Sequence, residues 1–234
     1  MARRPANRSR EINGTPWHAA KETPSEARET DRRAAEAAAQ LMLEDGIAGV
    51  RMTDIADTAK VGVATLYRHF STKVSLAVAA GTLMWAHLNQ RIHQVVESDG
   101  FLELDGAHRL QRLLNAYAAL YLENPSFVRF LDEFDHLVRQ EGDSVGQEAL
   151  AAYGQQVDSF YVMFEDAYLL GRSDGSVVRE VDFRTFYLTV AHALMGVAEK
   201  LVAGEVIPSD DFGGGELGAE LGCLVDMSVR YLRG

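Results

Sequence analysis

The chain has 234 residues, of which 47 % are hydrophobic, and a formal net charge of −11 at pH 7. This composition supports a sizeable core and excludes a mainly disordered chain. The single cysteine, Cys223, excludes an internal disulfide, and the lack of an apolar run of about 18 residues predicts that nothing spans a membrane. No apolar stretch follows the N-terminal arginines, so no secretory signal is expected and a cytoplasmic location is predicted.

Charge is unevenly distributed along the chain. Residues 1–80 hold 12 Lys and Arg against 10 Asp and Glu, whereas residues 81–234 hold 11 against 24. Only the first third can therefore present a face that attracts a polyanion. Composition alone is equally compatible with an acidic, solvated surface on an ordinary globular protein.

The N-terminal part of the chain begins with an irregular segment and then becomes helical. Residues 1–24 mix Arg, Pro, Asn and Gly without periodicity, which predicts a mobile arm whose arginines either touch DNA or act as a solubilising tail. From Ser25, a candidate N-cap, a helical pattern runs to Gly46, a candidate C-terminal stop. Further helices are predicted over 52–60, 61–70 and 73–97.

The rest of the chain also has a helical pattern. Asn124 and Pro125 predict a helix start, with the asparagine as cap and the proline in the first turn. Strand-like alternation does not persist anywhere, so the predicted fold class is all-α with about nine helices. The predicted segments after Gly100 cover about 107–122, 125–140, 147–171, 182–203 and 215–233.

The helix predicted at residues 63–70 has two different faces. At about 100° per residue, Leu66 and Phe70 fall on one side with Val63 close to them, while Ala64 and Arg68 point the opposite way. The preceding short helix offers an apolar face on which the two large residues can pack. Two short helices joined by a tight, glycine-containing turn describe a helix-turn-helix, whose second helix lies in the major groove of DNA.

The polar residues of this unit suit contacts with DNA. Arg68 can make a forked contact with guanine or phosphate, and the hydroxyls of Thr65 and Tyr67 can reach phosphate oxygens. Lys73 adds its charge to the positive end of the next helix, which favours phosphate. The predicted DNA-binding residues are Arg51, Thr53, Gly62, Val63, Ala64, Thr65, Tyr67, Arg68, His69 and Lys73.

The same residues resemble a known family signature. The pattern T-D-I-A-x-x-A-x-V-x-x-x-T-L-Y-x-H-F-x-x-K, from Thr53 to Lys73, is similar to that of the TetR family of bacterial transcriptional regulators, and the resemblance covers about residues 28–80. It implies a three-helix DNA-binding domain, a linking fourth helix and a helical ligand-binding domain that dimerises through its last two helices. In this family, ligand binding usually changes the spacing of the two reading heads and releases the operator.

Three positions depart from the family pattern. Arg51 stands where a Ser or Thr often caps the second helix, Gly62 replaces a frequent Ser, and Lys60 occupies a usual Gly. Arg51 and Lys60 are candidates for additional phosphate contacts, and Gly62 is a weak but acceptable cap. These changes bear on which operator is read more than on whether DNA is bound.

The implied organisation places an effector site in the acidic C-terminal part. A balance of −13 over residues 81–234 disfavours an anionic effector, so a neutral or cationic, largely apolar molecule is expected within apolar walls. The predicted lining residues are Tyr117, Phe130, Phe134, Tyr161, Phe164, Tyr168 and His192. Plain core packing is the alternative for each of them.

These observations predict a DNA-binding regulator that represses at a palindromic operator and works as a homodimer through residues 182–203 and 215–233. No cofactor or metal is expected. The predicted parts are an arm at 1–24, a DNA-binding domain at 25–72, a linking helix at 73–97 and a ligand-binding and dimerisation domain at 98–234.

Two other classes of function stay open at this point. Glu133 and His136 form a Glu-x-x-His pair of the kind used by di-iron helical bundles, which would suit a metal-dependent helical enzyme. A second such pair is missing from the sequence, which disfavours that interpretation. A helical ligand-binding scaffold without DNA binding is the other alternative.

Overall fold

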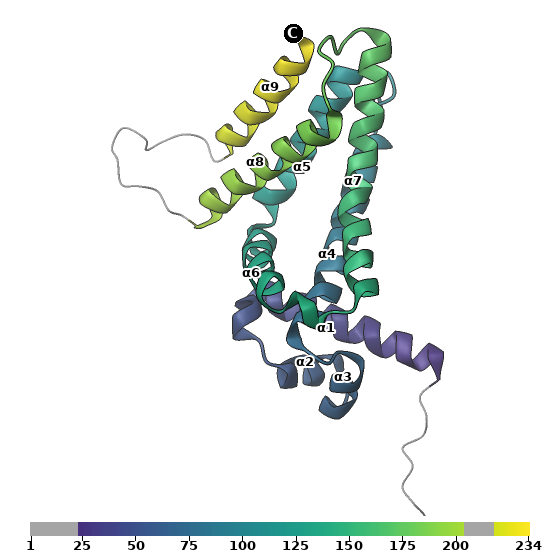
Figure 1. Cartoon of the computed structure of the whole chain (residues 1–234), viewed down its shortest axis with the longest axis vertical. Helices are drawn as coiled ribbons and strands as arrows, with labels where there is room; N and C mark the ends of the chain where they lie inside the picture. Colours follow the sequence, from purple (N-terminus) through teal and green to yellow (C-terminus); the bar gives the residue numbers. More distant parts are fainter. Residues whose placement is uncertain (1–22, 204–217) are drawn as a thin grey trace, which may run out of the picture.

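The computed structural model describes residues 23–203 and 218–234, and this part of the chain contains nine α-helices, one short 3-10 helix and no strand. The predicted all-α fold class is therefore confirmed. Figure 1 shows α1 to α3 gathered at one end of the molecule and α8 and α9 toward the other. The elements are α1 (Pro24–Gly49), α2 (Met52–Ala59), α3 (Val63–His69), α4 (Lys73–Val96), α5 (Gly106–Glu123), α6 (Pro125–Glu141), η1 (Gly142–Ser144), α7 (Gln147–Asp174), α8 (Phe183–Ala203) and α9 (Ala219–Arg233).

Helix α1 begins and ends differently from the sequence prediction. The cap is Thr23 rather than Ser25: its side chain accepts a hydrogen bond from Glu26 N–H, and the Glu26 carboxylate accepts one from Thr23 N–H. This reciprocal pair satisfies two amides that a helix start leaves free. Gly46 does not end the helix but bends it, with φ 75° and ψ 161° inside α1, and the helix resumes as far as Gly49.

Helices α2 and α3 form the predicted helix-turn-helix. Ile55 and Ala56 of α2 and Leu66 of α3 are fully buried where the two helices pack. The turn is closed by Lys60 in the left-handed conformation, with φ 56°, while Val61 N–H donates to Ala56 O. A left-handed residue after a helix is normally glycine, which explains physically why glycine is common at this turn.

The larger helical part is built around α4 and α7, which pack along each other, and Figure 1 shows α7 running beside α4 for much of its length. Helix α5 packs on α7, α8 and α9, and α6 packs on α1, α4 and α8. Asn124 and Pro125 begin α6 as predicted, but the Asn124 amide donates back to Leu120 O instead of capping α6.

Helices α5 and α7 cross at two glycines. A Cβ built on Gly106 would lie 2.0 Å from Gly171 N, so the backbones touch directly. At the same place the end of α7 caps the start of α5, because Gly106 N–H donates to Asp174 Oδ2 at 2.8 Å and Ala107 N–H donates to Ser176 Oγ at 3.0 Å. Amides left free at the start of α5 are thus satisfied by the chain that leaves α7.

Helix α8 is unusually apolar for its degree of burial. By length and composition alone it is long and apolar enough to cross a membrane, with a mean hydropathy of 1.3 over an 18-residue window, and this does not test the prediction that nothing spans a membrane. Only 22 % of this window is buried within the single chain. A helix that meets another protein surface satisfies the same criterion, and α8 already packs on α5, α6, α7 and α9.

Candidate nucleic-acid interface and ligand-binding domain

The short helix α3 has one packed face and one exposed face. Leu66 is fully buried, and Phe70 packs against the core from the residue after the helix. Ala64 and Arg68 are exposed on the opposite side, and Tyr67 is 51 % exposed. Apolar anchors therefore hold α3 in place while a small, a hydroxyl-bearing and a cationic side chain face outward, which is the arrangement needed to enter a major groove.

His69 does not belong to the exposed face. Its Nδ1 lies 2.7 Å from Asp31 Oδ1 of α1, and its side chain is only 9 % exposed. The structure therefore gives this predicted DNA contact a different role, since the imidazole fastens the end of α3 to α1. Tying down the recognition helix in this way holds its exposed residues in a fixed orientation.

Lys73 is also placed differently from the sequence prediction. Its ammonium donates to the carbonyl oxygens of Ile47 at 2.7 Å, Val50 at 3.0 Å and Ala48 at 3.4 Å. A helix end leaves carbonyls without partners, and a cation there is favoured by the helix dipole. All three donors of an ammonium are thus engaged by the end of α1, so Lys73 joins α4 to α1 instead of presenting its charge to phosphate.

The start of α2 presents the remaining predicted residues. Arg51 is the N-cap, and its side chain, 79 % exposed, pairs with Asp54 at 3.0 Å. Asp54 also accepts a hydrogen bond from Arg51 N–H, which satisfies the amide of the cap residue itself. The Arg51 side chain has no acceptor, so it does not cap the first helix amides as a Ser or Thr would. This pairing raises the pKa of Arg51 and lowers that of Asp54. Thr53 is exposed beside them, and Gly62 is exposed at the start of α3.

Comparison with known proteins decides what this helix-turn-helix is. Residues 35–80 match the family model described as bacterial regulatory proteins of the TetR family. Residues 35–80 are therefore a DNA-binding domain of the TetR-family type. No curated protein matches it by sequence.

Solved structures agree with this assignment at the level of the fold. A TetR-family regulator from Rhodococcus sp. has a TM-score of 0.60 at 19 % identity, covering 88 % of this chain and all of the other. The fatty acid degradation regulator FadR from Bacillus halodurans gives 0.56 at 18 % identity, with coverages of 92 % and 97 %. RolR in complex with resorcinol gives 0.60 at 17 % identity, with 90 % of both chains covered.

The chain thus carries the DNA-binding domain of bacterial regulatory proteins of the TetR family, and the solved structures extend the fold likeness over most of its length. The side chains of Glu133 and His136, the pair considered for a metal enzyme, take separate partners. Glu133 accepts a hydrogen bond from Ala48 N–H, and His136 Nε2 lies 2.8 Å from Gln140 Nε2. No group of three or more metal-ligating side chains occurs within residues 23–203 and 218–234.

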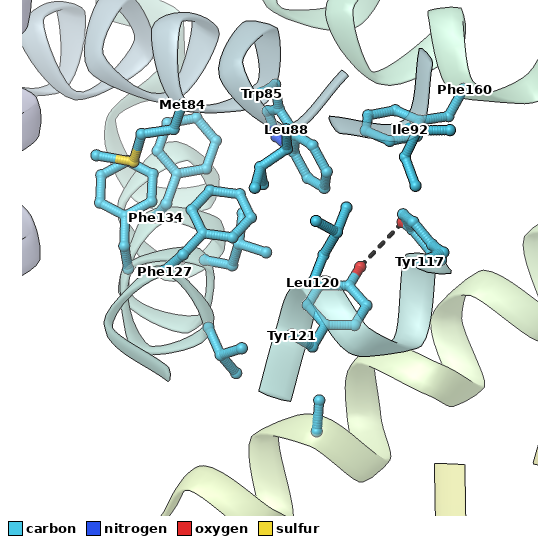
Figure 2. Packing of buried hydrophobic residues seen from close by; sticks show 14 of the residues in the cluster. Met84, Trp85, Leu88, Ile92, Tyr117, Leu120, Tyr121, Phe127, Phe134 and Phe160 are labelled. Atoms are coloured by element: carbon cyan, nitrogen blue, oxygen red, sulfur yellow. Dashed lines mark hydrogen bonds between the residues drawn. The ribbon is translucent and has the colours of Figure 1, made fainter. Parts of the chain in front are cut away.

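Four of the aromatic residues predicted to line an effector site, Phe130, Phe134, Tyr117 and Phe164, lie in the buried core. Phe130 and Phe134 stack at 5.5 Å on α6, and Phe134 stacks on Tyr153 of α7 at 4.9 Å. Tyr117 and Phe164 meet edge to face at 6.1 Å. Figure 2 shows Phe127 and Phe134 beside Met84, and Tyr117 with Tyr121 on the other side of the cluster.

Two further predicted residues, Tyr161 and Tyr168, pack on a separate ring, Phe183, toward the C-terminal end of α7. Tyr168 stacks on Phe183 at 4.6 Å, and Tyr161 is partly buried beside the same ring. His192 is exposed on α8 whereas Tyr117 is buried, so the single chain does not bring these two predicted lining residues together. Helical periodicity placed His192 in the domain but left open which side of α8 would be covered.

Two core residues of the linking helix, Trp85 and Asn89, were missed because that helix was treated only as a connector. Trp85 of α4 donates its Nε1–H to Tyr153 OH at 2.9 Å. Asn89 of α4 is 6 % exposed, and its amide nitrogen donates to Gln156 O at 2.8 Å. Its oxygen, Oδ1, is buried without a hydrogen-bond partner.

The buried phenols have shifted pKa values. Burial raises the pKa of Tyr153 to about 12, and burial likewise raises the pKa values of Tyr117, Tyr121 and Tyr187. All four phenols are therefore neutral at physiological pH, and a neutral phenol can donate one hydrogen bond as well as accept.

A surface pocket of about 220 Å³ lies between α6 and the end of α8, lined by residues that include Arg129, Asp132, Glu199 and Lys200. Burial raises the pKa of Glu199, and the nearby carboxylates of Asp132 and Asp135 raise it further. The pocket has charged walls beside apolar ones and contains none of the predicted lining residues. It does not correspond to the apolar effector site expected from the sequence.

Proposed function

We propose that this TetR-family regulator is a repressor that binds a palindromic operator as a homodimer and leaves it when a small, largely apolar molecule binds among α4 to α8. We propose with it the division into a DNA-binding domain at 25–72, a linking helix at 73–97 and an effector and dimerisation domain from 98 onward. The exposed face of α3, held by the buried Leu66, carries the proposal. A cytoplasmic location follows from the proposed contact with DNA.

The DNA-binding surface comprises exposed and partly exposed residues of the two short helices. We assign the base-reading role to Arg68, with Tyr67, Thr65 and Ala64 beside it, and the phosphate role to the start of α2 at Arg51. Gly62, Val63 and Thr53 lie at the same helix starts, where backbone N–H groups favour phosphate. His69 and Lys73 support the unit from behind through α1.

Selection of binding sequences from random duplex DNA, followed by titration, tests the DNA-binding surface. Arg68→Ala is expected to cost about 1–3 kcal/mol on the selected site if Arg68 reads a base. Arg51→Ala is expected to weaken selected and unrelated DNA alike, and to lower the slope of log affinity against log salt by roughly one. Wild-type protein that shows no preference for any sequence would refute the proposal.

The dimer is supported by apolar surface on α8 and α9 that the chain does not cover. Leu188 is 39 % exposed, Met227 is 62 % exposed and Tyr231 is 49 % exposed. A two-fold dimer would cover these side chains and would match a palindromic operator. We therefore propose the interface over 182–203 and the C-terminal helix, of which residues 215–217 lie outside the described part.

Light scattering tests the assembly. Wild-type protein is expected at twice the chain mass, and Met227→Glu, which would bury a charge in the interface, is expected to shift it toward the single-chain mass. Leu102→Glu is the matched control, because Leu102 is 72 % exposed but lies outside α8 and α9. A wild-type monomer at micromolar concentration contradicts the proposed dimer.

The effector site is expected near buried polar atoms that a ligand could hydrogen-bond. Tyr117 accepts the hydrogen bond of Tyr121, and Asn89 Oδ1 has no partner, so a ligand that supplies a hydrogen-bond donor would satisfy the Asn89 oxygen. Aromatic walls with a few oriented polar groups are typical of small-molecule sites. The structural neighbour RolR was solved with resorcinol, and phenols are therefore a reasonable first panel.

A ligand screen by thermal stabilisation, with phenols and fatty acids as the two panels, tests the effector proposal. Asn89→Leu is expected to abolish the response to a phenol while leaving the unliganded protein folded. The substitution removes the unpaired oxygen together with its desolvation penalty, and Gln156 O, which loses the Asn89 donor, keeps a hydrogen bond from Ser159 Oγ. Phe164→Ala is a poor probe, since Phe164 is 1 % exposed and its loss would cost about 3–5 kcal/mol of stability. A phenol response that survives in Asn89→Leu contradicts the assigned acceptor.

A further inference from the structure

The bend in α1 is contacted by a side chain that is far away in the sequence. At Gly46 the helix leaves its regular dihedral angles, with φ 75°. Two residues later, Ala48 N–H donates to Glu133 Oε2 of α6 at 3.1 Å. The two partners are 85 residues apart, and this bond connects the helix that supports the DNA-binding unit with a helix of the proposed effector domain.

The second oxygen of the same carboxylate rests on the bend itself. A Cβ built on Gly46 would lie 2.6 Å from Glu133 Oε1, which is closer than real Cβ contacts allow. Glycine at position 46 therefore serves both the left-handed dihedral angle and the close approach of Glu133. The carboxylate contacts α1 at two points, the bend and the amide that follows it.

Lys73 holds the same segment from the other side. Its ammonium donates to the carbonyls of Ile47, Ala48 and Val50, so α4 binds the acceptors of this segment while α6 binds a donor. The end of α1 is thus held between an anion from α6 and a cation from α4. We call the segment 46–50 with Glu133 and Lys73 the α1 clamp.

The position of Glu133 is set by the aromatic core. The next residue, Phe134, is 3 % exposed and stacks on Phe130 and on Tyr153 of α7. Figure 2 shows Phe134 on α6 facing Met84 of α4 within the buried cluster. A shift of α6 that repacks these rings would also move the Glu133 carboxylate, because both lie on one rigid helix.

We propose that Glu133 is a positioning residue that fixes the orientation of the DNA-binding unit relative to the effector domain, as a second connection beside α4. The proposal rests on the function proposed above, in which an event in the effector domain alters DNA binding. It gives a role to Glu133 of the Glu-x-x-His pair, whose carboxylate is bonded to Ala48 N–H of α1.

Hydrogen exchange gives the first test. Glu133→Leu is expected to speed exchange of the Ala48 amide roughly tenfold, as loss of a charge-assisted hydrogen bond implies. Glu133→Gln keeps an acceptor oxygen and is expected to restore most of the protection. Glu141→Gln, an exposed acid at the end of the same helix, is the control and should leave exchange unchanged.

Spin-label distance measurements test the orientation itself. Labels at Asp57→Cys on α2 and Gln155→Cys on α7, in a Cys223→Ser background, report the position of the DNA-binding unit within one chain when labelled protein is diluted with unlabelled protein. Both positions are exposed. Glu133→Leu is expected to broaden this distance distribution, and Glu133→Gln to narrow it again. An unchanged distribution in folded Glu133→Leu overturns the proposal.

Neither measurement involves DNA, so their failure is distinguishable from failure of the proposed function. Wild-type protein that selects no DNA sequence refutes the proposed repressor function. The exchange and distance measurements on the α1 clamp are still valid in that case, because they do not depend on DNA. If Glu133→Leu does not fold, the same two measurements on Glu133→Gln test the proposal, and any loss of Ala48 protection is expected to come with a broader distance distribution. Loss of Ala48 protection in a folded Glu133→Gln protein, with an unbroadened distribution, would count against a positioning role.

Discussion

Single residues in this regulator have acquired roles that their types do not reveal. Lys60 and Lys73 are both cations near the DNA-binding helices, yet Lys73 is engaged with the end of α1 and Lys60 closes a turn in the left-handed conformation. The two differ because the Lys73 ammonium has backbone carbonyls within reach. Lys60 instead occupies a left-handed backbone position that is unfavourable for a residue with a Cβ. A positive charge beside a recognition helix is therefore insufficient to assign a phosphate contact.

Lys60→Gly is expected to stabilise the protein. A residue with a Cβ costs roughly 1–2 kcal/mol in the left-handed region, and glycine removes this cost. Lys60→Ala is the control, because it removes the charge but keeps the strain at φ 56°. Denaturant unfolding measures both variants, and a Lys60→Gly protein no more stable than Lys60→Ala would contradict this account. If Lys60 also contacts phosphate, both variants lower the salt slope of DNA binding by about one.

Among the helices, the crossing of α5 and α7 has the least room to adjust. A Cβ placed on Gly106 would be obstructed by backbone atoms, with Gly171 N at 2.0 Å and Ala167 O at 2.5 Å. Backbone in the middle of a packed helix cannot rotate aside as a side chain can. The start of α5 would have to leave the Asp174 and Ser176 caps to make space.

Gly106→Ala is expected to destabilise the protein by about 1–3 kcal/mol or more, as overpacking of a close contact does. Gly154→Ala is the matched control on α7, where a Cβ would meet nothing within 4 Å. That substitution is expected to be neutral or stabilising by up to about 1 kcal/mol, from helix propensity alone. Equal unfolding midpoints for the two variants, measured in denaturant, would show that the helices are not in the close contact described.

At the scale of the whole molecule, the core carries buried phenols that must remain neutral. The folded pKa of Tyr153 is about 12 against 10.0 for an exposed phenol, and the pKa values of Tyr117, Tyr121 and Tyr187 are also raised. Because ionisation is easier in the unfolded chain, the stability due to these groups is complete below about pH 10 and is lost as the pH rises toward about 12.

The free energy of unfolding is therefore expected to fall steeply above about pH 10, by up to about 1.4 kcal/mol per pH unit for each buried phenol. Denaturant unfolding at a series of alkaline pH values measures this slope, and phenolate absorbance follows ionisation. Tyr187→Phe removes one ionisable phenol and is expected to make the slope shallower by that phenol's contribution, up to about 1.4 kcal/mol per pH unit. A flat profile across this interval would mean that the tyrosines ionise as readily in the folded state as in the unfolded state.

The sequence by itself determined the helical class, the helix-turn-helix and the family, because these depend on local spacing: Leu66 and Phe70 on one side of α3, and the turn signals around it, leave little choice of packing. The tertiary structure decided which side of each later helix is covered. Tyr117 and Phe164 meet in the core while His192, on an equally apolar helix, remains outside. It also decided the partners of Lys73 and Glu133, which come from 23 and 85 residues away. Contacts at such separations depend on how whole helices cross, and no local pattern along the chain records that geometry.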